Sequence, residues 1–459
     1  MDSISNIVSS QKTFFNSQKT KSVTSRLVYL NALKNEILSK EHAIYEALYK
    51  DFKKSEFETF ISEFGLVISQ LNLVIKNLNK WAKPQQVKSS ILTFPSKDYI
   101  YKEPYGNVLV ISPWNYPFLL ALEPLIMAVA AGNTVVLKPS ELTKHTSQIL
   151  TDIIKTVFPE DYITSVQGDA HVATELLSQK WGYIFFTGSV SVGKIVAEAA
   201  AKHLTPVTLE LGGKSPCIID DTANLKLTAK RLVWGKFFNA GQTCIAPDYV
   251  IIKRHIKKEF IELLKEEITQ FYGENPKESI DYPRIINTKN TLCLAKMLKD
   301  NHVIFGGTID ETDNYVAPTL IDEPALDSEV MRSEIFGPIL PILTYDTEKD
   351  IESIITNFEK PLALYTFSSN KTFINHILNT YSFGGGVVND VLIHFSNHRL
   401  PFGGVGTSGM GVYHGKHGFD TFSHDKSVIK RGTWLDPTTR YAPYKQNFGF
   451  IKKLFNFFS

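Results

Sequence analysis

Hydrophobic residues along this chain follow two different periods. Over residues 24–83, apolar side chains such as Leu30, Leu33 and Ile37 recur at helical spacing, which predicts a set of helices. Beyond Gly106, short runs that are apolar on both faces alternate with longer amphipathic stretches. Such alternation of buried strands with helices predicts a parallel, doubly wound α/β sheet, which binds its ligands at the carboxyl ends of its strands.

The sequence contains two consecutive α/β series, separated by Gly212 and Gly213. In the first series, strands are predicted at 108–111, 134–137, 163–167, 183–186 and 205–210, and helices at 119–131, 147–158, 172–178 and 190–203. In the second series, helices are predicted at 225–238, 256–271, 350–358 and 373–381, and strands at 249–252, 317–321, 339–345, 362–367 and 386–388. Residues 89–94 and 100–103 are expected to form an extended pair, onto which residues 420–430 add strands.

The length of 459 residues exceeds what one hydrophobic core usually supports, which favours two joined α/β domains. We predict a first domain from 1–85 and 104–211 and a second domain from 212–400. A small β bridging element with the C-terminal tail is predicted from 86–103 and 401–459.

The composition narrows the function classes. Hydrophobic residues make up 43% and charged residues 21%, and the formal net charge is +2, which argues against a nucleic-acid partner. Only three cysteines occur, and they show no CxxC spacing, so a disulfide framework and a cysteine-rich zinc site are both excluded. A reducing compartment is expected, with the cytoplasm as the default.

Neither end of the chain predicts a membrane-spanning segment. The N-terminal residues are polar, whereas a secretory signal would have a basic stretch followed by an apolar one. In addition, no uncharged apolar run reaches the roughly 18 residues that a membrane helix needs. The C-terminal end is rich in phenylalanine from Phe448 to Phe458 and contains Lys452 and Lys453. Two interpretations stay open: the tail docks on its own domain or a partner subunit, or it makes peripheral contact with a membrane surface.

The segment from Phe238 to Pro247 places Cys244 in a turn, after an apolar helical pattern. A thiol reacts as its thiolate, and backbone N–H groups in a turn both lower its pKa and hold an oxyanion. This predicts a reactive thiol at Cys244. The alternative is that Cys244 is a small packing residue, as we expect for Cys217 and Cys293 in their apolar settings.

Two further segments follow predicted strands and suit a nucleotide. The turn from Gly188 to Gly193 opens a helix, where glycines let the backbone approach an anion such as pyrophosphate. Lys138 and Glu141 suit the hydroxyls of a ribose, and a glutamate there would repel a 2′-phosphate, which favours NAD over NADP. The alternatives are an ordinary glycine turn and a solvated ion pair.

Three other segments offer groups for chemistry. Glu210 ends a predicted strand among apolar neighbours, which suits a base of raised pKa that activates water. Asn115 lies just past the first strand, where its amide suits an oxyanion, although a turn-forming asparagine is the usual alternative. Glu334 and Phe336 put a carboxylate and an aromatic ring into one turn.

Taken together in chain order, these motifs resemble those of the aldehyde dehydrogenase superfamily. The order is Asn115, Lys138 and Glu141, Gly188 and Gly193, Glu210, Cys244, Glu334 and Phe336, then Asn389 and the glycine-rich loop 400–411. The motifs run from about 104 to 424. Segments 360–365, 413–420 and 440–444 are similar to the class 3 subgroup, whose members also lack the longer N-terminal arm of the tetrameric classes. One departure is Ser333, where many relatives carry an acidic residue before the equivalent of Glu334.

The resemblance implies an α/β fold with a Rossmann-like NAD(P)-binding domain at 1–85 and 104–211, a catalytic domain at 212–400, and a bridging or oligomerisation element that favours a homodimer. It implies that Cys244 is the nucleophile, that Asn115 and the Cys244 N–H hold the oxyanion, and that Glu210 activates water. The cofactor residues that it implies are Lys138, Glu141, Gly188, Ser189, Gly193, Glu334 and Phe336. NAD is the expected cofactor, with NADP as the alternative, and no metal is expected.

The implied substrate is a medium- to long-chain aliphatic or aromatic aldehyde, in a pocket assigned to Tyr116, Trp234, Phe238 and Phe395. Three alternatives stay open. The first is a thiol hydrolase of esters built on Cys244 and Glu210. The second is a CoA-acylating enzyme, but Glu210 as a water activator argues against it. The third is a non-enzymatic binding protein, but the intact Cys244, Glu210 and Asn115 argue against it.

Overall fold

The computed structural model describes residues 3–299, 301–436, 438–444 and 448–458. The chain divides into two compact units. Unit 1 comprises Met1–Trp81 and Pro104–His424, and unit 2 comprises Ala82–Glu103 and Asp425–Ser459. Residues 401–424 therefore belong to unit 1 and not to the predicted bridging element. The reason is that β17 (Gly409–Met410) pairs with β7 (Val207–Glu210), which fastens this segment to the first sheet.

A six-stranded sheet forms one half of unit 1, in the order β17-β7-β6-β3-β4-β5. The parallel strands are β3 (Asn107–Ile111), β4 (Thr134–Lys138), β5 (Ile163–Ser165), β6 (Tyr183–Thr187) and β7. The register pairs Ile111 with Lys138 and Thr187 with Glu210. The carboxyl ends of these strands therefore bring Lys138, Thr187 and Glu210 to the same edge of the sheet, as the doubly wound pattern predicted.

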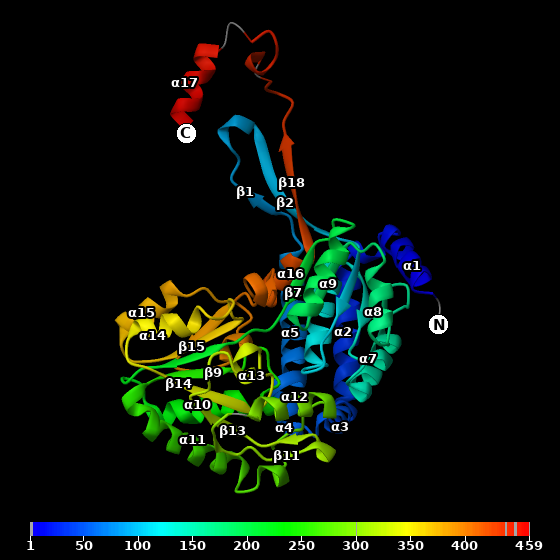
Figure 1. The fold of residues 1–459 in the computed structure, drawn as a ribbon. Helices are drawn as coiled ribbons and strands as arrows, with labels where there is room; N and C mark the ends of the chain where they lie inside the picture. Colours follow the sequence, from blue (N-terminus) through cyan, green and yellow to red (C-terminus); the bar gives the residue numbers. More distant parts are fainter. Residues whose placement is uncertain (1–2, 300, 437, 445–447, 459) are drawn as a thin grey trace. The chain divides into compact units, whose positions relative to one another are not determined.

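Helices cover both faces of this sheet (Figure 1). The helices that contact its strands include α1 (Ile4–Asn16), α6 (Leu119–Ala131), α7 (Lys144–Val157) and α9 (Val190–Ala201), and the further helices of this half are α2 (Val23–Ser39), α3 (Glu41–Phe52), α4 (Glu56–Thr59), α5 (Gly65–Trp81) and α8 (Ala170–Leu177). Helix α6 is buried along its whole length, and all of its sequence is apolar except Glu123. A core cluster joins α1, α8 and α9 to the central strands through residues such as Val8, Leu109 and Val196.

A seven-stranded sheet forms the other half, in the order β10-β13-β14-β9-β8-β15-β16. Its strands are β8 (Pro216–Ile219), β9 (Tyr249–Lys253), β10 (Val303–Phe305), β13 (Thr319–Asp322), β14 (Ile339–Tyr345), β15 (Ala363–Phe367) and β16 (Gly385–Val388). Its helices include α10 (Leu225–Phe237), α11 (Lys257–Tyr272), α12 (Thr288–Leu298), α14 (Glu348–Ile355) and α15 (Lys371–Thr380). Only β10 runs antiparallel to its neighbour among the described pairings. Strand β10 was not predicted from the sequence, whereas β8 falls in the apolar, strand-like segment 215–219 around Cys217.

Short elements complete unit 1. They are η1 (Lys19–Lys21), η4 (Phe238–Gly241), η5 (Arg254–Ile256), η6 (Pro276–Glu278), β11 (Ile309–Asp310), η7 (Glu311–Asp313), β12 (Tyr315–Val316), α13 (Glu329–Arg332), η8 (Ile393–Ser396), η9 (Gly406–Ser408) and α16 (Gly415–Thr421). Between α4 and α5 the helix widens into a π-helical turn, η2 (Phe60–Phe64). Such turns are rare in proteins overall, and those that occur are often at functional sites.

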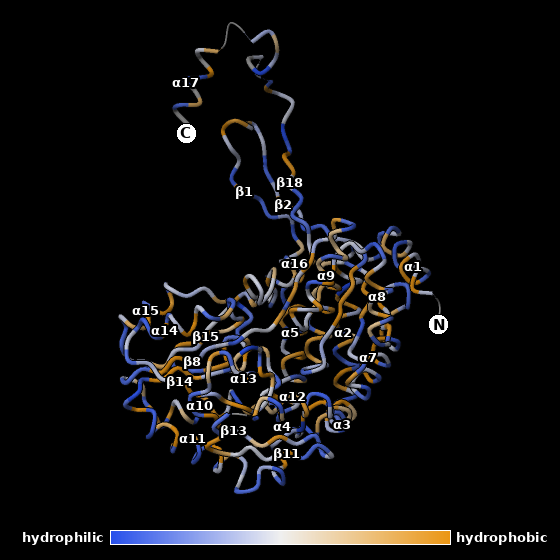
Figure 2. Tube along the Cα trace, viewed as in Figure 1, coloured by the Kyte–Doolittle hydropathy of each residue, from blue (hydrophilic) through white to orange (hydrophobic). Residues whose placement is uncertain are grey.

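Unit 2 is a three-stranded sheet in the order β1-β2-β18, made of β1 (Gln85–Val87), β2 (Ser96–Pro104) and β18 (Ser423–Arg431). The pairing of β2 with β18 confirms that residues 420–430 return to the region of Ile100. The predicted extended segment 89–94 is wrong, because Ser90 caps a short 3-10 turn, η3 (Ile91–Thr93), and β2 pairs with β1 instead. Figure 2 shows β1, β2 and β18 as mainly hydrophilic.

The tail of unit 2 contains η10 (Thr438–Arg440) and α17 (Phe448–Phe458). Phe448 and Phe455 are exposed, whereas the side chains of Phe450, Leu454, Phe457 and Phe458 lie outside the described residues, so both interpretations of the tail stay predictions. Within the described ranges, one helical run, Glu56–Trp81, is long and apolar enough to cross a membrane by length and hydropathy alone. Half of its most apolar window is buried inside unit 1, as in a core helix of a globular fold.

Candidate active site

Two cavities in unit 1 meet at Thr187, Glu210 and Cys244. The smaller cavity has a volume of about 270 Å³ and almost entirely apolar walls, whereas the larger has a volume of about 620 Å³ and walls that are more polar. Thr187 and Glu210 reach this junction from the carboxyl ends of neighbouring strands. A thiol and a carboxylate therefore stand where an apolar pocket opens into a polar one.

The loop that carries Cys244 follows α10 through the short turn η4. Asn239 and Ala240 both adopt left-handed backbone angles there, with φ of 52° and 51°, and Gly241 follows at 74°. Left-handed conformations at non-glycine residues cost about 1–3 kcal/mol each and persist where the surroundings hold them. The backbone N–H groups of Cys244 and Ile245 act to lower the pKa of the Cys244 thiol.

The pKa of the Cys244 thiol is raised, chiefly by burial and then by the negative charges of Glu334 and Glu210. The two backbone N–H groups oppose this effect but do not reverse it. The N–H groups of the turn therefore lower the pKa of the thiol as expected, but desolvation and two carboxylates outweigh them, so the net shift is upward. The thiol needs a base to ionise it.

Glu210 is 3% exposed at the end of β7, and neither of its carboxylate oxygens has a hydrogen-bond partner among the described residues. Burial raises its pKa well above the ordinary value, and the charge of Glu123 adds to the shift. A carboxyl group with free oxygens and a raised pKa suits general-base catalysis near neutral pH. This is the environment that the apolar neighbours of Glu210 in the sequence predicted.

Asn115 and Tyr116 follow β3 and contact the Cys244 loop. The Asn115 side-chain amide donates to the Gln242 carbonyl oxygen at 3.1 Å, and the Tyr116 hydroxyl lies 2.6 Å from Thr243 Oγ1. An amide nitrogen carries two N–H groups, so Asn115 keeps a second donor. The structure brings Asn115, Glu210 and Cys244 together at the larger cavity.

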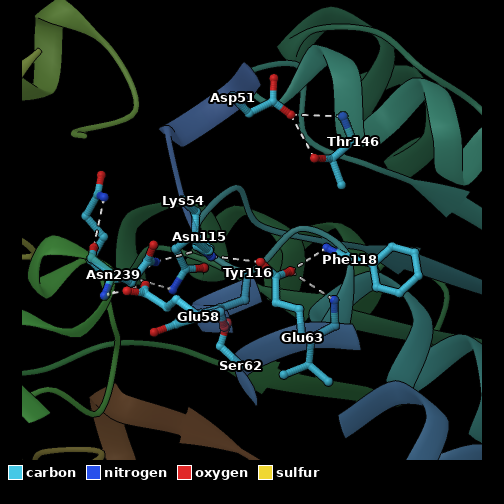
Figure 3. Close-up of polar contacts among 12 residues, drawn as sticks. Asp51, Lys54, Glu58, Ser62, Glu63, Asn115, Tyr116, Phe118, Thr146 and Asn239 are labelled. Carbon is cyan, nitrogen blue, oxygen red and sulfur yellow. Dashed lines mark hydrogen bonds and ion pairs between the residues drawn. The ribbon is translucent and has the colours of Figure 1, made fainter. Parts of the chain in front are cut away.

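A buried charged network supports this arrangement (Figure 3). Lys54 and Glu63 are both completely buried and form an ion pair at 2.8 Å, and the Lys54 ammonium also lies 4.7 Å from the centre of the Tyr116 ring. The other oxygen of Glu63 accepts the backbone N–H groups of Phe118 and Leu119, at 2.9 and 3.2 Å. One carboxylate therefore neutralises a buried lysine and satisfies the start of α6.

Glu58 connects the same network to the thiol loop. Its carboxylate accepts the Asn239 N–H at 2.9 Å, and the Asn239 amide donates to the Asn115 carbonyl oxygen at 2.8 Å. Burial raises the pKa of Glu58 to about 7, against the favourable charge of Lys54. Sequence reasoning missed Lys54, Glu58 and Glu63. The sequence did contain a signal for the burial of Glu63, because Glu63 lies four residues before the apolar Val67 and therefore on the same face of a helix.

The larger cavity contains most of the predicted cofactor residues: Lys138, Glu141, Gly188, Ser189, Glu334 and Phe336. Lys138 is buried and pairs with the half-exposed Glu141 at 2.6 Å. A Cβ at Gly212 would lie 1.9 Å from the Glu334 carboxylate, so a glycine is needed there. Burial, followed by the charge of Asp248, raises the pKa of Glu334 to about 8.

Gly193 is the exception among these residues. It does not line either described cavity, and a Cβ there would lie 2.7 Å from the Leu211 side chain. Its role is to let α9 pack closely, while Gly188 and Ser189 at the start of α9 face the cavity. The predicted contact of Gly193 with a cofactor is not supported by its position.

The smaller cavity is lined by all four residues predicted for a substrate pocket: Tyr116, Trp234, Phe238 and Phe395. The sequence reasoning missed several further apolar walls: Leu119, Leu120, Leu392, Ile393, Phe402 and Tyr413. These side chains come from loops and from α6, where a buried position and a pocket position have the same hydrophobic pattern.

The other two cysteines differ from each other. Cys217 is buried in β8, as predicted, and burial raises its pKa. Cys293 is exposed on α12, so the prediction that it is a packing residue was wrong. The helix buries Thr291, Leu294 and Met297 instead, and position 293 falls on the opposite face.

Comparisons with known proteins agree on one family. The family model described as "Aldehyde dehydrogenase family" matches residues 2–428. The chain is 45% identical over 446 residues to 4,4'-diaponeurosporen-aldehyde dehydrogenase of Staphylococcus aureus, with 97% of each chain covered. It is 44% identical over 435 residues to aldehyde dehydrogenase family 3 member A2 of Mus musculus, covering 94% of this chain and 90% of the relative.

Solved structures give the same result. One described as the substrate-bound state of Staphylococcus aureus AldH superposes with a TM-score of 0.97 at 45% identity, covering 99% of this chain and 100% of the other. The NAD-dependent aldehyde dehydrogenase from Sinorhizobium meliloti superposes with a TM-score of 0.84 at 26% identity, covering 94% of this chain and 87% of the other.

Proposed function

Since the chain belongs to the class 3 part of the aldehyde dehydrogenase family and is an oxidoreductase, we propose that it oxidises an aldehyde to the carboxylic acid through a thiohemiacetal and a thioester on Cys244. The observation that carries this proposal is the junction of the two cavities. It places the thiol and Glu210 at the end of an apolar pocket and at the edge of a polar cavity.

The larger cavity fits a nicotinamide dinucleotide. Buried Lys138 and its partner Glu141 suit the hydroxyls of a ribose, and the free N–H groups at the start of α9 suit a pyrophosphate. Glu334 and Phe336 line the part of the cavity that also contains Cys244. When bound there, the oxidised nicotinamide supplies the hydride acceptor that converts the thiohemiacetal into a thioester.

The thiol must first lose its proton, because its pKa is raised. Glu210 and Glu334 are the carboxylates whose charges act on Cys244, so the proton passes to one of them. The thiolate then bonds to the carbonyl carbon of the aldehyde, and the carbonyl oxygen becomes an oxyanion. The Cys244 N–H and the second N–H of the Asn115 amide are the donors available to it.

Release of the acid needs a water molecule activated by a base. Glu210 has two unpartnered oxygens and a raised pKa, so it accepts a proton from water as the water oxygen attacks the thioester carbon. The carbon–sulfur bond then breaks and the Cys244 thiolate leaves. Because Glu210 activates water to hydrolyse the thioester, its presence argues against transfer of the acyl group to CoA.

The substrate we propose is a medium- to long-chain aliphatic or aromatic aldehyde, because aromatic and aliphatic side chains make up nearly all of the smaller cavity. NAD is the proposed cofactor, since the Glu141 carboxylate disfavours a 2′-phosphate, and NADP is the alternative; one relative bears the name "dimeric NADP-preferring". We further propose a homodimer in the cytoplasm, without a nucleic-acid partner and with peripheral membrane contact by α17 as an open alternative.

A steady-state comparison of a straight-chain aldehyde series, with NAD and with NADP, tests the proposal. We expect absorbance of reduced nicotinamide, highest kcat/KM for the longer aldehydes, and loss of all turnover in Cys244→Ala. Absence of nicotinamide reduction with every aldehyde, while the Cys244 thiol remains titratable, would disprove it. Ester hydrolysis without cofactor and without aldehyde oxidation would favour a thiol hydrolase instead, although no histidine lines either cavity in the described part of the chain.

A further inference from the structure

A second cluster of ionisable side chains lies behind the apolar pocket. Glu123 of α6, His398 of the loop after η8, and His414 just before α16 bring one oxygen and two ring nitrogens within 4.8 Å of one another. Glu123 is 2% exposed and His414 is 1% exposed, while His398 is partly buried and reaches towards the surface. None of the three belongs to the proposed chemistry at Cys244.

These groups have unused bonding capacity. His414 Nε2 lies 3.3 Å from Glu123 Oε1, but neither His414 nitrogen makes a hydrogen bond among the described residues, and Glu123 Oε2 has no partner either. The contact that His398 makes is between its Nε2 and Ser69 Oγ at 3.3 Å, which leaves its Nδ1 unpartnered. Buried polar atoms are almost always bonded, so these unpartnered atoms have the capacity to bind a ligand placed between them.

The separation of Glu123 from His414 suits two ligands of one ion. Two atoms that bind the same tetrahedral Zn²⁺ at about 2.1 Å lie about 3.4 Å apart. The observed 3.3 Å is close to this value, and the orientation of the two groups does not make a hydrogen bond. The ligand atom of His398 lies within 4.8 Å of the other two, so metal binding requires this side chain to move closer to them.

The surroundings hold His414 in place. Its ring packs against Phe395 and Phe402, with ring centres 4.4 and 5.3 Å away, and its backbone has a φ of 85°. A left-handed conformation at a bulky buried residue persists only where the fold fixes it, and such strain concentrates at functional sites. Phe395 and Phe402 also line the smaller cavity, so the cluster lies one layer of side chains behind it.

We propose that Glu123, His398 and His414 form a binding site for a divalent transition-metal ion, Zn²⁺ by ligand type, that is separate from the proposed aldehyde-oxidising centre. Two imidazoles and one carboxylate match the preference of Zn²⁺, whereas Mg²⁺ and Ca²⁺ prefer oxygen ligands. The carboxylate offsets part of the charge of the ion, and the exposed side of His398 gives access from solvent. His394, four residues before His398, stacks its ring on Phe402, and neither of its ring nitrogens has a hydrogen-bond partner among the described residues.

Metal binding to the full-length chain tests this proposal. The protein is stripped with a chelator, equilibrated with low-micromolar free Zn²⁺, passed through a desalting column and analysed for bound zinc. Cys244→Ala is the essential background, since a reactive thiol also binds zinc. Glu123→Gln and His398→Asn remove one ligand each, and His417→Asn, on α16 but outside the cluster, is the matched control.

We expect a single bound Zn²⁺ in the Cys244→Ala chain and in its His417→Asn derivative, with affinity weaker by about tenfold or more after Glu123→Gln or His398→Asn. With Co²⁺ in place of zinc, the visible bands of a tetrahedral complex without a thiolate contribution are expected. Lack of stoichiometric zinc in the Cys244→Ala chain overturns the proposal. Zinc that is retained in full by both ligand variants overturns it as well. Neither result bears on aldehyde oxidation, which is measured by nicotinamide reduction.

Discussion

Two buried polar regions lie near the Cys244 thiol, and they differ in how far their hydrogen bonds are satisfied. In the first region, Lys54, Glu58 and Glu63 each have a partner, and these partners include the backbone of the Asn239 loop and the start of α6. In the second region, Glu210 and Glu123 have oxygens without any partner among the described residues.

This difference separates structural from chemical roles. A buried group with all its bonds made has no free capacity, so it positions other groups and stabilises the fold. A buried group with unused oxygens or nitrogens costs free energy and persists where a ligand, a water molecule or a reaction completes it. We therefore expect substitutions in the first region to change stability, and substitutions in the second to change chemistry or binding.

The largest effect on activity is expected for Glu210→Gln. Loss of the base should lower turnover by about a hundred- to ten-thousand-fold, because general-base catalysis contributes that much. A single burst of reduced nicotinamide is expected to remain where Glu334 takes the thiol proton, and to be lost where Glu210 takes it, because the thiol must ionise before the thioester forms. Thermal unfolding at pH 8 should show a chain no less stable than the wild type, because the raised pKa of Glu210 makes it a destabilising group there.

The partnered region should respond in the opposite way. Lys54→Met keeps the volume of the side chain but leaves Glu63 buried without its cation, and we expect the free energy of unfolding to fall by about 3–5 kcal/mol. The double variant Lys54→Met, Glu63→Gln should recover most of this loss, because the amide oxygen still accepts from the start of α6. Chemical denaturation of the four chains measures the coupling. An unchanged midpoint for Lys54→Met would contradict the assignment of a stabilising role.

The same contrast explains how much the sequence could predict. Helix 119–131 and strand 339–345 were predicted with their observed bounds, because continuous apolar runs of these lengths have few other solutions. Cys244, Glu210 and Asn115, which line one cavity, could be singled out because each follows an element whose end could be predicted. Glu123 and His414 were missed, since the residues that face them lie hundreds of positions apart and their local sequence gives no periodic signal.

Buried charges were the main failure. A charged residue in an amphipathic helix is usually read as solvated, so Lys54 and Glu63 gave no warning that both are completely buried. The segment 89–94 failed for a different reason, because β1 is only three residues long and two of them are polar, which leaves no strand pattern to detect. The raised pKa of Cys244 depends on two carboxylates brought to it by folding.

A third prediction concerns the pH dependence of stability. The pKa of Glu58 is raised from 4.5 to about 7, so the folded chain keeps a proton that the unfolded chain loses at lower pH. Stability should therefore fall as the pH rises from 4.5 to 7, by up to about 3 kcal/mol at about 1.4 kcal/mol per pH unit. Glu58→Gln should remove this slope, since the amide cannot ionise but still accepts the Asn239 N–H.

Unfolding of Glu58→Gln and the wild type at pH 5 and pH 8 makes the comparison. The two chains should be nearly equal at the lower pH, and the variant should be the more stable at the higher pH. Lys54, Glu63 and Asp281 also act on Glu58, and because they are present in both chains the difference between the chains isolates Glu58. A difference that does not change with pH would remove Glu58 from the titrating groups.

The smallest effect on activity is expected for Glu141, which has an ion-pair partner but is also proposed to bind the cofactor. Lys138 and Glu141 form an ion pair with Glu141 half exposed, and the same groups are proposed to bind the ribose. Glu141→Gln removes a negative charge that repels a 2′-phosphate, so the ratio of kcat/KM for NADP to that for NAD should rise by about fivefold, since an exposed charge contributes up to about 1 kcal/mol. Its thermal midpoint should hardly change, in contrast to Lys54→Met. An unaltered cofactor ratio at low and at high salt would show that Glu141 does not face the 2′ position.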